Sequence, residues 1–339
     1  MTTTADLRTP ALLVDVAALE ANADAMAARR PGLSLRPHVK AFKSTRLARW
    51  LADRCGHTAL CAATLGEVEG LAAAGLGHDV LLANETLDVD RLRSLAHRDD
   101  LRLTVAVDSD ETLAAAVAAG VPEVLVDVDV GLPRCGCEPG EAPRLADAAR
   151  AAGLMVRGVM GYEGQCQDWT EVERRRAEVE RAMAVLAAAH AEVGGDVVSA
   201  GGTGTHALNE VATEIQAGSY LLMDTHYARL GDLPFTPALS VLATVVSARV
   251  RPGGWYVLDA GLKALAMDHG NPTAEVGEVF FCSDEHTTVL AEPELGVRVG
   301  DRVRLRPAHV DPTVAKHPRL HLVDGDEVVD VWPVDLRDW

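Results

Sequence analysis

The middle of the chain alternates between short apolar runs and longer amphipathic stretches. The apolar runs are rich in Val, Leu and Ala and are short enough to be buried β-strands. Eight runs have this character: LSLRPHVK, TALCAA, VLLAN, LTVAVD, EVLVDVDV, MVRGVMGY, VVSAGG and YLLMD. The stretches between them, such as STRLARWLADRC and TEVERRRAEVERAMAVLAAAHAEV, are dominated by strong helix formers. The pattern therefore predicts a repeated strand–helix unit.

Eight such units over roughly 200 residues match a (β/α)8 TIM-type barrel in number and size. The predicted fold class is α/β, and an open doubly wound sheet is the alternative. After Leu233 the chain changes to strand and turn segments with little helical pattern. We therefore expect a barrel domain at 20–233 and a β-domain at 234–339, which the first residues, about 1–19, would join.

A barrel places its functional groups after the C-terminal ends of the strands. The residues in those positions are Lys40, Thr64, Asn84, Asp108, Arg134, Tyr162, the GGTGT segment and Asp224.

Composition excludes several classes of partner. The formal net charge of −18 argues against a nucleic-acid or anionic membrane surface. No apolar run reaches the roughly 20 residues of a membrane helix, and the first residues do not have the pattern of a secretory signal. Six cysteines in 339 residues do not indicate a disulfide framework. We predict a cytoplasmic protein with a small-molecule substrate.

The segment GGTGT, Gly201–Thr205, has two interpretations. Its glycines allow close backbone approach, so its N–H groups could hold a phosphate. It lacks the spacing of a Walker or dinucleotide-binding loop, and a tight strand–helix turn is the alternative. A position after the seventh strand favours phosphate, because barrel phosphate sites use the loops after strands seven and eight.

Lys40 gives the phosphate interpretation a chemical purpose. A lysine amine and a distant phosphate anchor are the two groups that pyridoxal 5'-phosphate (PLP) requires. Desolvation at a strand end disfavours the ammonium form and makes such an amine nucleophilic. The alternative is a surface lysine whose stem covers apolar groups.

The chain resembles the alanine-racemase-type (fold-type III) PLP enzymes, in the group of D-threonine aldolase and D-serine dehydratase. The matching segments occur in order over nearly the whole chain: TPALLVD, RPHVKAFKS, CAATLGEVEGLAAAG, DVDVGLPRCG, GYEGQCQ, GGTGT, QAGSYLLMD, DAGLKALAMDHG, PAHVDPTV and VVDVWPV.

The resemblance implies that Lys40 forms the imine with PLP and that the protein is a homodimer. It also implies the remaining cofactor-binding residues, which are Arg134, Tyr162, Gly202, Thr203, Gly204, Thr205 and Tyr220. Arg134 would donate to the phenolic oxygen of PLP, or instead form a salt bridge. Tyr162 would pack near the pyridine ring, or instead be an ordinary aromatic residue at the rim.

The segment RPAHVDPTV contains an HxD pair, His309 and Asp311. On a strand, both side chains would emerge from one face and could hold one metal ion, although a lone HxD is often structural. The resemblance implies that this pair binds a divalent metal beside the cofactor. Because Asp311 offers a hard oxygen, manganese or magnesium is favoured, with zinc or calcium as alternatives.

One position departs from the family pattern. In the aldolases a histidine follows the second Gln of GYEGQCQDW and is a candidate base on the β-hydroxyl, whereas this chain has Asp168. We expect Asp168 to be the catalytic base and neutral substrates to be preferred over 3-hydroxyaspartate.

The function that these features predict is retro-aldol cleavage of D-3-hydroxy-amino acids, such as D-threonine or phenylserine, to glycine and an aldehyde. The alternatives are a D-serine or 3-hydroxyaspartate dehydratase, an amino-acid racemase, and a PLP carrier without turnover.

Overall fold

The structure is a computed structural model that describes residues 2–339, except for the side chain of Asp168. The chain divides into two compact units. The barrel unit contains Met26–Lys40, Leu47–Gly218 and Leu336–Trp339. The sheet unit contains the residues up to Ala25, Ala41–Arg46 and Ser219–Asp335. The domain boundaries at residues 20 and 234 stay a prediction beside this division.

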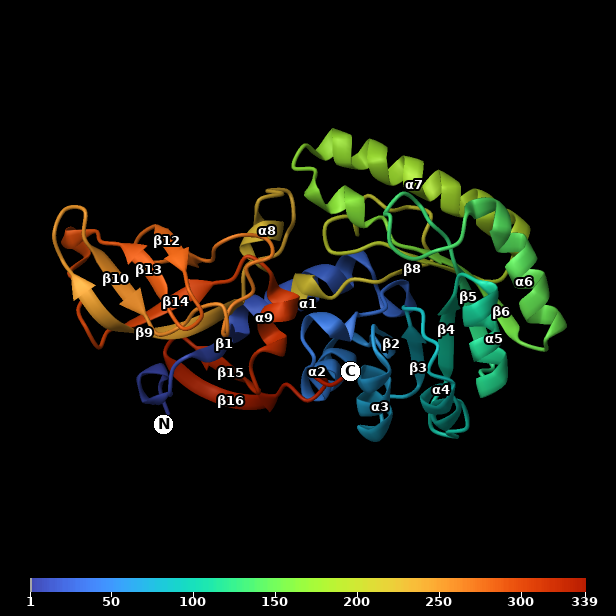
Figure 1. The fold of residues 1–339 in the computed structure, drawn as a ribbon, viewed down its shortest axis with the longest axis horizontal. Helices are drawn as coiled ribbons and strands as arrows, with labels where there is room; N and C mark the ends of the chain where they lie inside the picture. The colour runs from blue at the N-terminus through green and yellow to red at the C-terminus, as the bar shows by residue number, and fades with distance from the viewer. Residues whose placement is uncertain (1) are drawn as a thin grey trace. The chain divides into compact units, whose positions relative to one another are not determined.

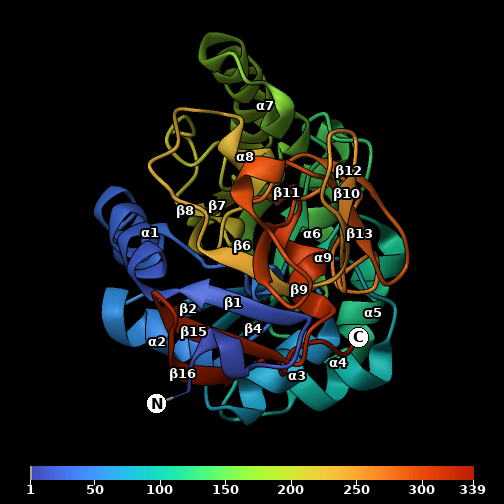
Figure 2. The ribbon, with the colours of Figure 1, turned by 90° about the vertical axis from the view of Figure 1, so that its left-hand side faces the viewer.

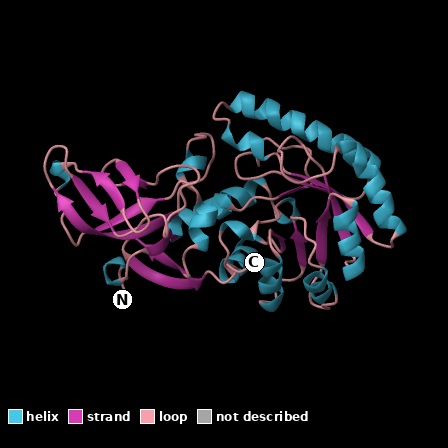
Figure 3. Cartoon of the chain, in the orientation of Figure 1, coloured by secondary structure: helices cyan, strands magenta, loops and turns pink. Residues whose placement is uncertain are grey.

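Parallel strands form the sheet of the barrel unit, in the order β2-β3-β4-β5-β6-β7-β8 (Figure 1). Their bounds are β2 (Ala59–Ala62), β3 (Asp79–Leu82), β4 (Leu103–Val107), β5 (Glu123–Asp127), β6 (Met155–Gly161), β7 (Val197–Ala200) and β8 (Glu214–Ile215). The helices that alternate with them are α2 (Thr45–Cys55), α3 (Leu65–Ala73), α4 (Val89–Ala96), α5 (Asp110–Ala119), α6 (Ala142–Ala151) and α7 (Val172–Val193). Helices α3 to α7 lie outside the strands (Figure 3).

Residues 35–38 lie between β8 and β2 and complete the barrel. Leu35 forms a parallel bridge with Ile215, and His38 forms one with Cys61. The N–H of Cys61 donates to the carbonyl of Pro37 over 2.9 Å. Because Pro37 has no N–H to donate, this segment makes bridges rather than a full strand. The predicted α/β barrel with a β-domain is confirmed as the fold class.

The prediction of an eighth strand at YLLMD, residues 220–224, is wrong. Ser219–Leu221 form a 3-10 helix, η6, and the eighth strand is β8. The residues of the run are buried, and a short buried apolar run has the same pattern in a strand and in a helical turn. Asp224 consequently does not end a strand. It is the N-cap of α8 (Thr225–Ala228) and accepts a hydrogen bond from the N–H of Tyr227.

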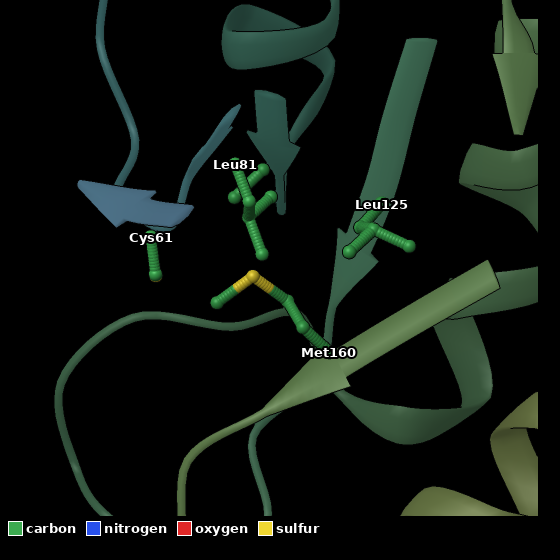
Figure 4. Close-up of a cluster of buried hydrophobic side chains, with 5 residues drawn as sticks. Cys61, Leu81, Leu125 and Met160 are labelled. Atoms are coloured by element: carbon green, nitrogen blue, oxygen red, sulfur yellow. The ribbon is translucent and has the colours of Figure 1, made fainter. Parts of the chain in front are cut away.

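The barrel interior is apolar between its two ends. A cluster of buried side chains from successive strands fills it, and Figure 4 shows the side chains of Cys61, Leu81, Leu125 and Met160 gathered in one cluster. Ala106 of β4 completes the cluster. Alternate inward-facing positions of adjacent parallel strands produce this packing.

Charged side chains pair where the barrel strands begin. Arg36, with 2 % of its side chain exposed, donates to Glu214 over 2.8 Å and to Asp79 over 2.9 Å. Arg157 also contacts Asp79, over 3.2 Å. Burial alone would lower the pKa of the Arg36 guanidinium, but its two carboxylate partners raise that pKa above its usual value. These charges are satisfied within the protein and stabilise this end of the barrel.

The sheet unit is built on a sheet in the order β12-β13-β10-β9-β1-β15-β16, in which β14 also pairs with β9 and with β11. Strand β1 lies between β9 and β15, antiparallel to the first and parallel to the second (Figure 2). The strand bounds are β1 (Ala11–Asp15), β9 (Leu239–Arg249), β10 (Trp255–Leu258), β11 (Thr273–Ala274), β12 (Val279–Cys282), β13 (Thr287–Leu290), β14 (Arg302–Arg306), β15 (Arg319–Asp324) and β16 (Glu327–Pro333). The remaining α-helices are α1 (Val16–Arg29) and α9 (Val310–Ala315). Among the described residues, no helix is long and apolar enough to cross a membrane.

Candidate active site

Lys40 follows residues 35–38 at the C-terminal end of the barrel. It lies in a 3-10 turn, η3 (Val39–Ala41), whose other residues are buried while Lys40 is half-buried. Its Nζ is 5.8 Å from the centroid of the Tyr162 ring, which follows β6. The amine is thus at the end of the barrel where active sites of this fold are built.

A second cation approaches the same aromatic ring. Arg134, in the loop after β5, has its Cζ 5.3 Å from the Tyr162 centroid. A small cavity beside the ring is lined in part by Arg134, Asp127 and Cys135. The structure therefore brings Lys40, Arg134 and Tyr162 together, although they are distant in sequence.

The GGTGT loop follows β7 and is buried throughout. Gly201 has a φ of +84°, a backbone conformation that favours glycine. A Cβ at Gly202 would lie 3.2 Å from Nε2 of Gln167 and 3.4 Å from the ring of Tyr162, so this residue must also be small. The Thr203 hydroxyl is buried and has no hydrogen-bond partner among the described residues.

Two side chains from the loop after β6 hold the GGTGT loop. Glu163, which is fully buried, accepts hydrogen bonds from the Gly201 N–H over 3.0 Å and from the Asn209 amide over 3.3 Å. Gln167 accepts from the Gly204 N–H over 2.9 Å. Burial raises the pKa of the Glu163 carboxyl, and the hydrogen bonds that it accepts oppose that shift.

A pair of acids lies close to the Arg134 side of the site. Burial raises the pKa of Asp127 well above its usual value, and the neighbouring Glu85 carboxyl raises it further. Both Glu85 carboxyl oxygens are shielded from solvent. Two carboxyl groups that share a buried space favour one bound proton between them.

The sheet unit holds the HxD pair at the start of α9. His309 is the N-cap residue and Asp311 lies in the first helical turn, so the two residues do not share a strand as expected. Nδ1 of His309 is 2.5 Å from Oδ2 of Asp268, and Oδ1 of Asp311 accepts a hydrogen bond from Ser219 over 2.9 Å. The backbone between them is anchored, because the N–H of Val310 donates to Asp224 over 2.9 Å. Burial raises the pKa of the Asp224 carboxyl to about 6, although the hydrogen bonds that it accepts from the N–H groups of Tyr227 and Val310 oppose that shift.

His269 stacks on His309, and His226 packs against His269 with its ring tilted by 48°. The rings of His269 and His309 are parallel within 10° and their centroids are 4.2 Å apart. His226 packs on His269 with the same centroid separation. The possible ligand atoms of Asp268, His269 and His309 all lie within 4.8 Å of one another. The sheet unit therefore gathers nitrogen and oxygen donors suited to a divalent cation.

Comparison with known proteins identifies the class of molecule. The sequence model of the alanine racemase N-terminal domain matches residues 14–226, and that of a serine dehydratase domain matches residues 238–323. The chain belongs to the alanine-racemase-like PLP enzymes. The resemblance inferred from the sequence is thereby confirmed, and PLP is the cofactor of the family.

Individual relatives narrow the group. D-threonine aldolase from Arthrobacter sp. is 37 % identical over 97 % of this chain and 92 % of the relative. 3-hydroxy-D-aspartate aldolase from Paracoccus denitrificans is 34 % identical over 98 % of this chain and 92 % of the relative. The crystal structure of D-threonine aldolase from Filomicrobium marinum superposes with a TM-score of 0.89 at 34 % identity, covering 98 % of this chain and 97 % of the other.

The barrel residues of this PLP enzyme fit the cofactor. Lys40 supplies an amine, and the buried Thr203 hydroxyl supplies a hydrogen-bond donor. The absence of Cβ atoms at Gly201 and Gly202 lets the loop pack closely against Ile215 and against Gln167 and Tyr162. An imidazole nitrogen of His309 and a carboxylate oxygen of Asp311 are donor types that suit manganese, magnesium or zinc, whereas the ligand atoms that the structure gathers around His309 are those of Asp268 and His269.

Two predicted site residues of this PLP enzyme stay predictions. The side chain of Asp168 lies outside the described part of the chain. Tyr220 is fully buried in the sheet unit, where its ring lies 5.5 Å from that of Phe235.

The sequence interpretation also missed functional neighbours. Glu163, Gln167, Asp127 and Asp268 lie inside quoted motifs, but the sequence assigned them no role. The available signal was an acidic or amide residue next to a glycine or inside an apolar run, since such residues are rarely buried without a partner.

Proposed function

We propose that this chain is a PLP-dependent lyase that splits D-3-hydroxy-amino acids of the threonine and phenylserine type into glycine and an aldehyde. A divalent metal held by His309 and Asp311 is the second cofactor in this proposal. The observation that carries it is the position of the Lys40 amine, 5.8 Å from the Tyr162 ring at the C-terminal end of the barrel. Full-length similarity to two kinds of D-3-hydroxy-amino-acid aldolase supports the choice of reaction.

The chain's own residues have separate tasks. Bound PLP supplies an electron sink for cleavage of the Cα–Cβ bond, and a bound divalent ion supplies a Lewis acid for the β-hydroxyl. Lys40 attaches the cofactor covalently through Nζ. The loop Gly202, Thr203, Gly204 and Thr205 would hold its phosphate, with Glu163 and Gln167 bracing the loop. The Thr203 hydroxyl is the proposed donor, because the N–H groups of Gly202 and Gly204 already donate to Thr205 and Gln167.

Arg134 and Tyr162 orient the cofactor ring. The guanidinium of Arg134 would donate to the phenolic oxygen, and the Tyr162 ring would pack near the pyridine; in the structure Cζ of Arg134 lies 5.3 Å from the centroid of that ring. The buried pair of Glu85 and Asp127 lies near Arg134, whose positive charge opposes, without reversing, the rise in the Asp127 pKa that burial and Glu85 cause.

Metal choice follows from the ligand atoms. Asp311 is a hard oxygen donor, so manganese or magnesium is favoured over zinc and calcium. Asp168 is the proposed base for the proton of the β-hydroxyl, whose pKa a bound divalent metal would lower. A homodimer and a cytoplasmic location complete the proposal and rest on the sequence.

One incubation tests the reaction. Purified chain is mixed with D-threonine, PLP and Mn²⁺, and aldehyde and ammonia are assayed in parallel. We expect acetaldehyde and glycine in equal amounts, without ammonia. Borohydride reduction followed by tryptic mapping should place the pyridoxyl label on Lys40 and leave Lys43 unmodified. A label on any other residue contradicts the assignment of the site.

A dehydratase is the second candidate. The match of residues 238–323 to a serine dehydratase domain favours it. In that reaction the same incubation with D-serine or 3-hydroxyaspartate releases ammonia and a 2-oxo acid. A preference for 3-hydroxyaspartate over D-threonine in the aldolase assay would also refute the predicted effect of Asp168 on substrate choice.

A further inference from the structure

We propose that Asp268 is a positioning residue of the metal site: it accepts the Nδ1–H hydrogen of His309 and so fixes Nε2 of that histidine as the atom that binds the metal. The inference rests on the proposed function, because it assumes that His309 is a metal ligand. It goes beyond that function by assigning the bound nitrogen, the residue that selects it and the part played by His269.

The contact between Asp268 and His309 fixes the position of the imidazole proton. The separation of 2.5 Å between Nδ1 of His309 and Oδ2 of Asp268 is shorter than a typical N–H···O hydrogen bond, and two such atoms approach this closely only with a proton between them. A carboxylate only accepts, so the imidazole must donate, and its proton is on Nδ1. The lone pair of the neutral ring is then on Nε2. A hydrogen bond at one ring nitrogen decides in this way which nitrogen a metal can use.

Asp268 and Nδ1 of His309 lie too close together to be two ligands of one metal ion. Two ligand atoms of one octahedral ion, each about 2.1 Å from it, lie about 3.0 Å apart when adjacent, and farther apart in a tetrahedral site. The observed 2.5 Å is shorter than either separation. Asp268 and Nδ1 of His309 therefore form a pair with each other rather than a shared coordination sphere.

The ring of His269 is stacked on that of His309 and does not share a metal ion with it. The lone pair of an imidazole nitrogen lies in the plane of its ring. The planes of His269 and His309 are parallel within 10° and their centroids are 4.2 Å apart. In-plane lone pairs of two stacked rings do not converge on one ion. His269 therefore supports the face of His309, while Asp268 fixes its edge, and the two contacts together determine the rotation of the His309 ring.

The backbone around the ring is equally constrained. Asp224 holds the N–H of Val310 over 2.9 Å, and the Thr313 hydroxyl donates to the carbonyl of His309 over 2.7 Å. With backbone, ring edge and ring face all held, the Nε2 donor is oriented before a metal binds. Outer partners of this kind typically change metal affinity by about 10- to 100-fold.

The test measures metal binding directly on the full chain loaded with PLP and stripped of metal. Mn²⁺ is titrated at fixed pH and the free ion is followed by its EPR signal. Asp268→Ala should weaken binding by about 10- to 100-fold, whereas Asp268→Asn, which keeps an oxygen acceptor for Nδ1–H, should retain most of the affinity. Asp99→Ala, which removes an exposed carboxylate from the barrel unit, is the control for net charge and should bind as the unaltered chain does.

A matched pair tests the stack. His269→Phe keeps a flat ring against His309 and removes the nitrogens, so Mn²⁺ affinity should be unchanged. His269→Ala removes the support as well and should weaken binding by a few-fold. Pulsed EPR of the bound Mn²⁺ should detect one histidine nitrogen in the unaltered chain, in Asp268→Asn and in His269→Phe.

The outcomes separate the inference from the function on which it rests. If His309→Ala binds Mn²⁺ as well as the unaltered chain, the metal site itself is misplaced and the proposed function loses its second cofactor. If His309→Ala loses the metal but Asp268→Ala does not, only the positioning inference fails. If the Mn²⁺ affinity of Asp268→Asn falls as far as that of Asp268→Ala, Asp268 is a ligand and the inference is overturned. The same holds for His269 if the EPR spectrum of His269→Phe has lost a histidine nitrogen. Circular dichroism and the visible absorbance of bound PLP check that each variant is folded and loaded.

Discussion

The two ends of the barrel differ in how their charged and polar side chains are paired. Where the strands begin, Arg36 has carboxylate partners at 2.8 and 2.9 Å, so a buried charge is neutralised by the protein. Where the strands end, Lys40 and Arg134 approach the Tyr162 ring, and the buried hydroxyl of Thr203 has no partner within the described chain. The first arrangement maintains the fold, and the second leaves groups available to a ligand. Substitutions at the two ends should therefore affect different measurements.

The largest effect is expected at Lys40. Lys40→Ala removes the amine that attaches the cofactor, so aldehyde release from D-threonine should fall by at least about 1,000-fold. The free energy of unfolding without PLP should stay within about 0.5 kcal/mol, because the side chain is only half-buried. Lys43→Ala is the control and should keep the activity. Full activity in Lys40→Ala would remove the basis of the proposed function.

At the opposite end, Arg36→Met should lower stability rather than catalysis. It leaves the carboxylates of Glu214 and Asp79 buried without their main partner, which typically costs about 3–5 kcal/mol. Urea unfolding measures the loss, and PLP affinity per folded molecule should not change. Stability equal to that of the unaltered chain would mean that the charges at this end are solvated.

Thr203→Val should weaken PLP binding rather than lower stability, the reverse of Arg36→Met. The hydroxyl has no partner among the described residues, so its loss should leave stability nearly unchanged. It should weaken PLP binding by about 10-fold, the equivalent of one hydrogen bond to a charged group. Thr205→Val is the matched comparison, because Thr205 accepts a hydrogen bond from the Gly202 N–H over 3.0 Å and its loss should reduce stability as well. Equal PLP affinity in Thr203→Val and the unaltered chain would exclude Thr203 from the phosphate site.

The smallest effect concerns pH. Burial raises the pKa of Glu163 in the folded chain above its usual value near 4.5. The folded state therefore keeps this proton at a pH at which the unfolded state has lost it. The resulting stabilisation is complete below about pH 4.5 and is lost as pH rises through the raised pKa.

Glu163→Gln imitates the protonated side chain and does not titrate. Its stability relative to the unaltered chain should therefore increase with pH, by at most about 1.4 kcal/mol per pH unit within that window. Urea unfolding of both chains across the window measures the difference. A difference that is independent of pH would mean that the Glu163 pKa is not raised.

The sequence predicted individual elements and motifs well, but it predicted contacts between distant segments poorly. Alternation of strand and helix patterns identified the barrel, and Lys40, Arg134 and Tyr162 were selected by their positions after predicted strands. The eighth strand was misplaced because YLLMD is buried in either conformation. The HxD pair was expected on a strand, but Pro312 follows Asp311 directly, and proline suits the first turn of a helix.

Periodicity by itself determined the fold class, because burial and helix formation leave a pattern in neighbouring residues. The roles of Lys40 and of the HxD pair came from the resemblance of their motifs to a known family. Packing determined the rest. The closure of the barrel by residues 35–38, the bracing of GGTGT by Glu163 and Gln167, and the contact of Asp268 with His309 join residues that are distant along the chain. Such contacts depend on how the elements pack in three dimensions, and that packing leaves no local periodicity from which to infer them.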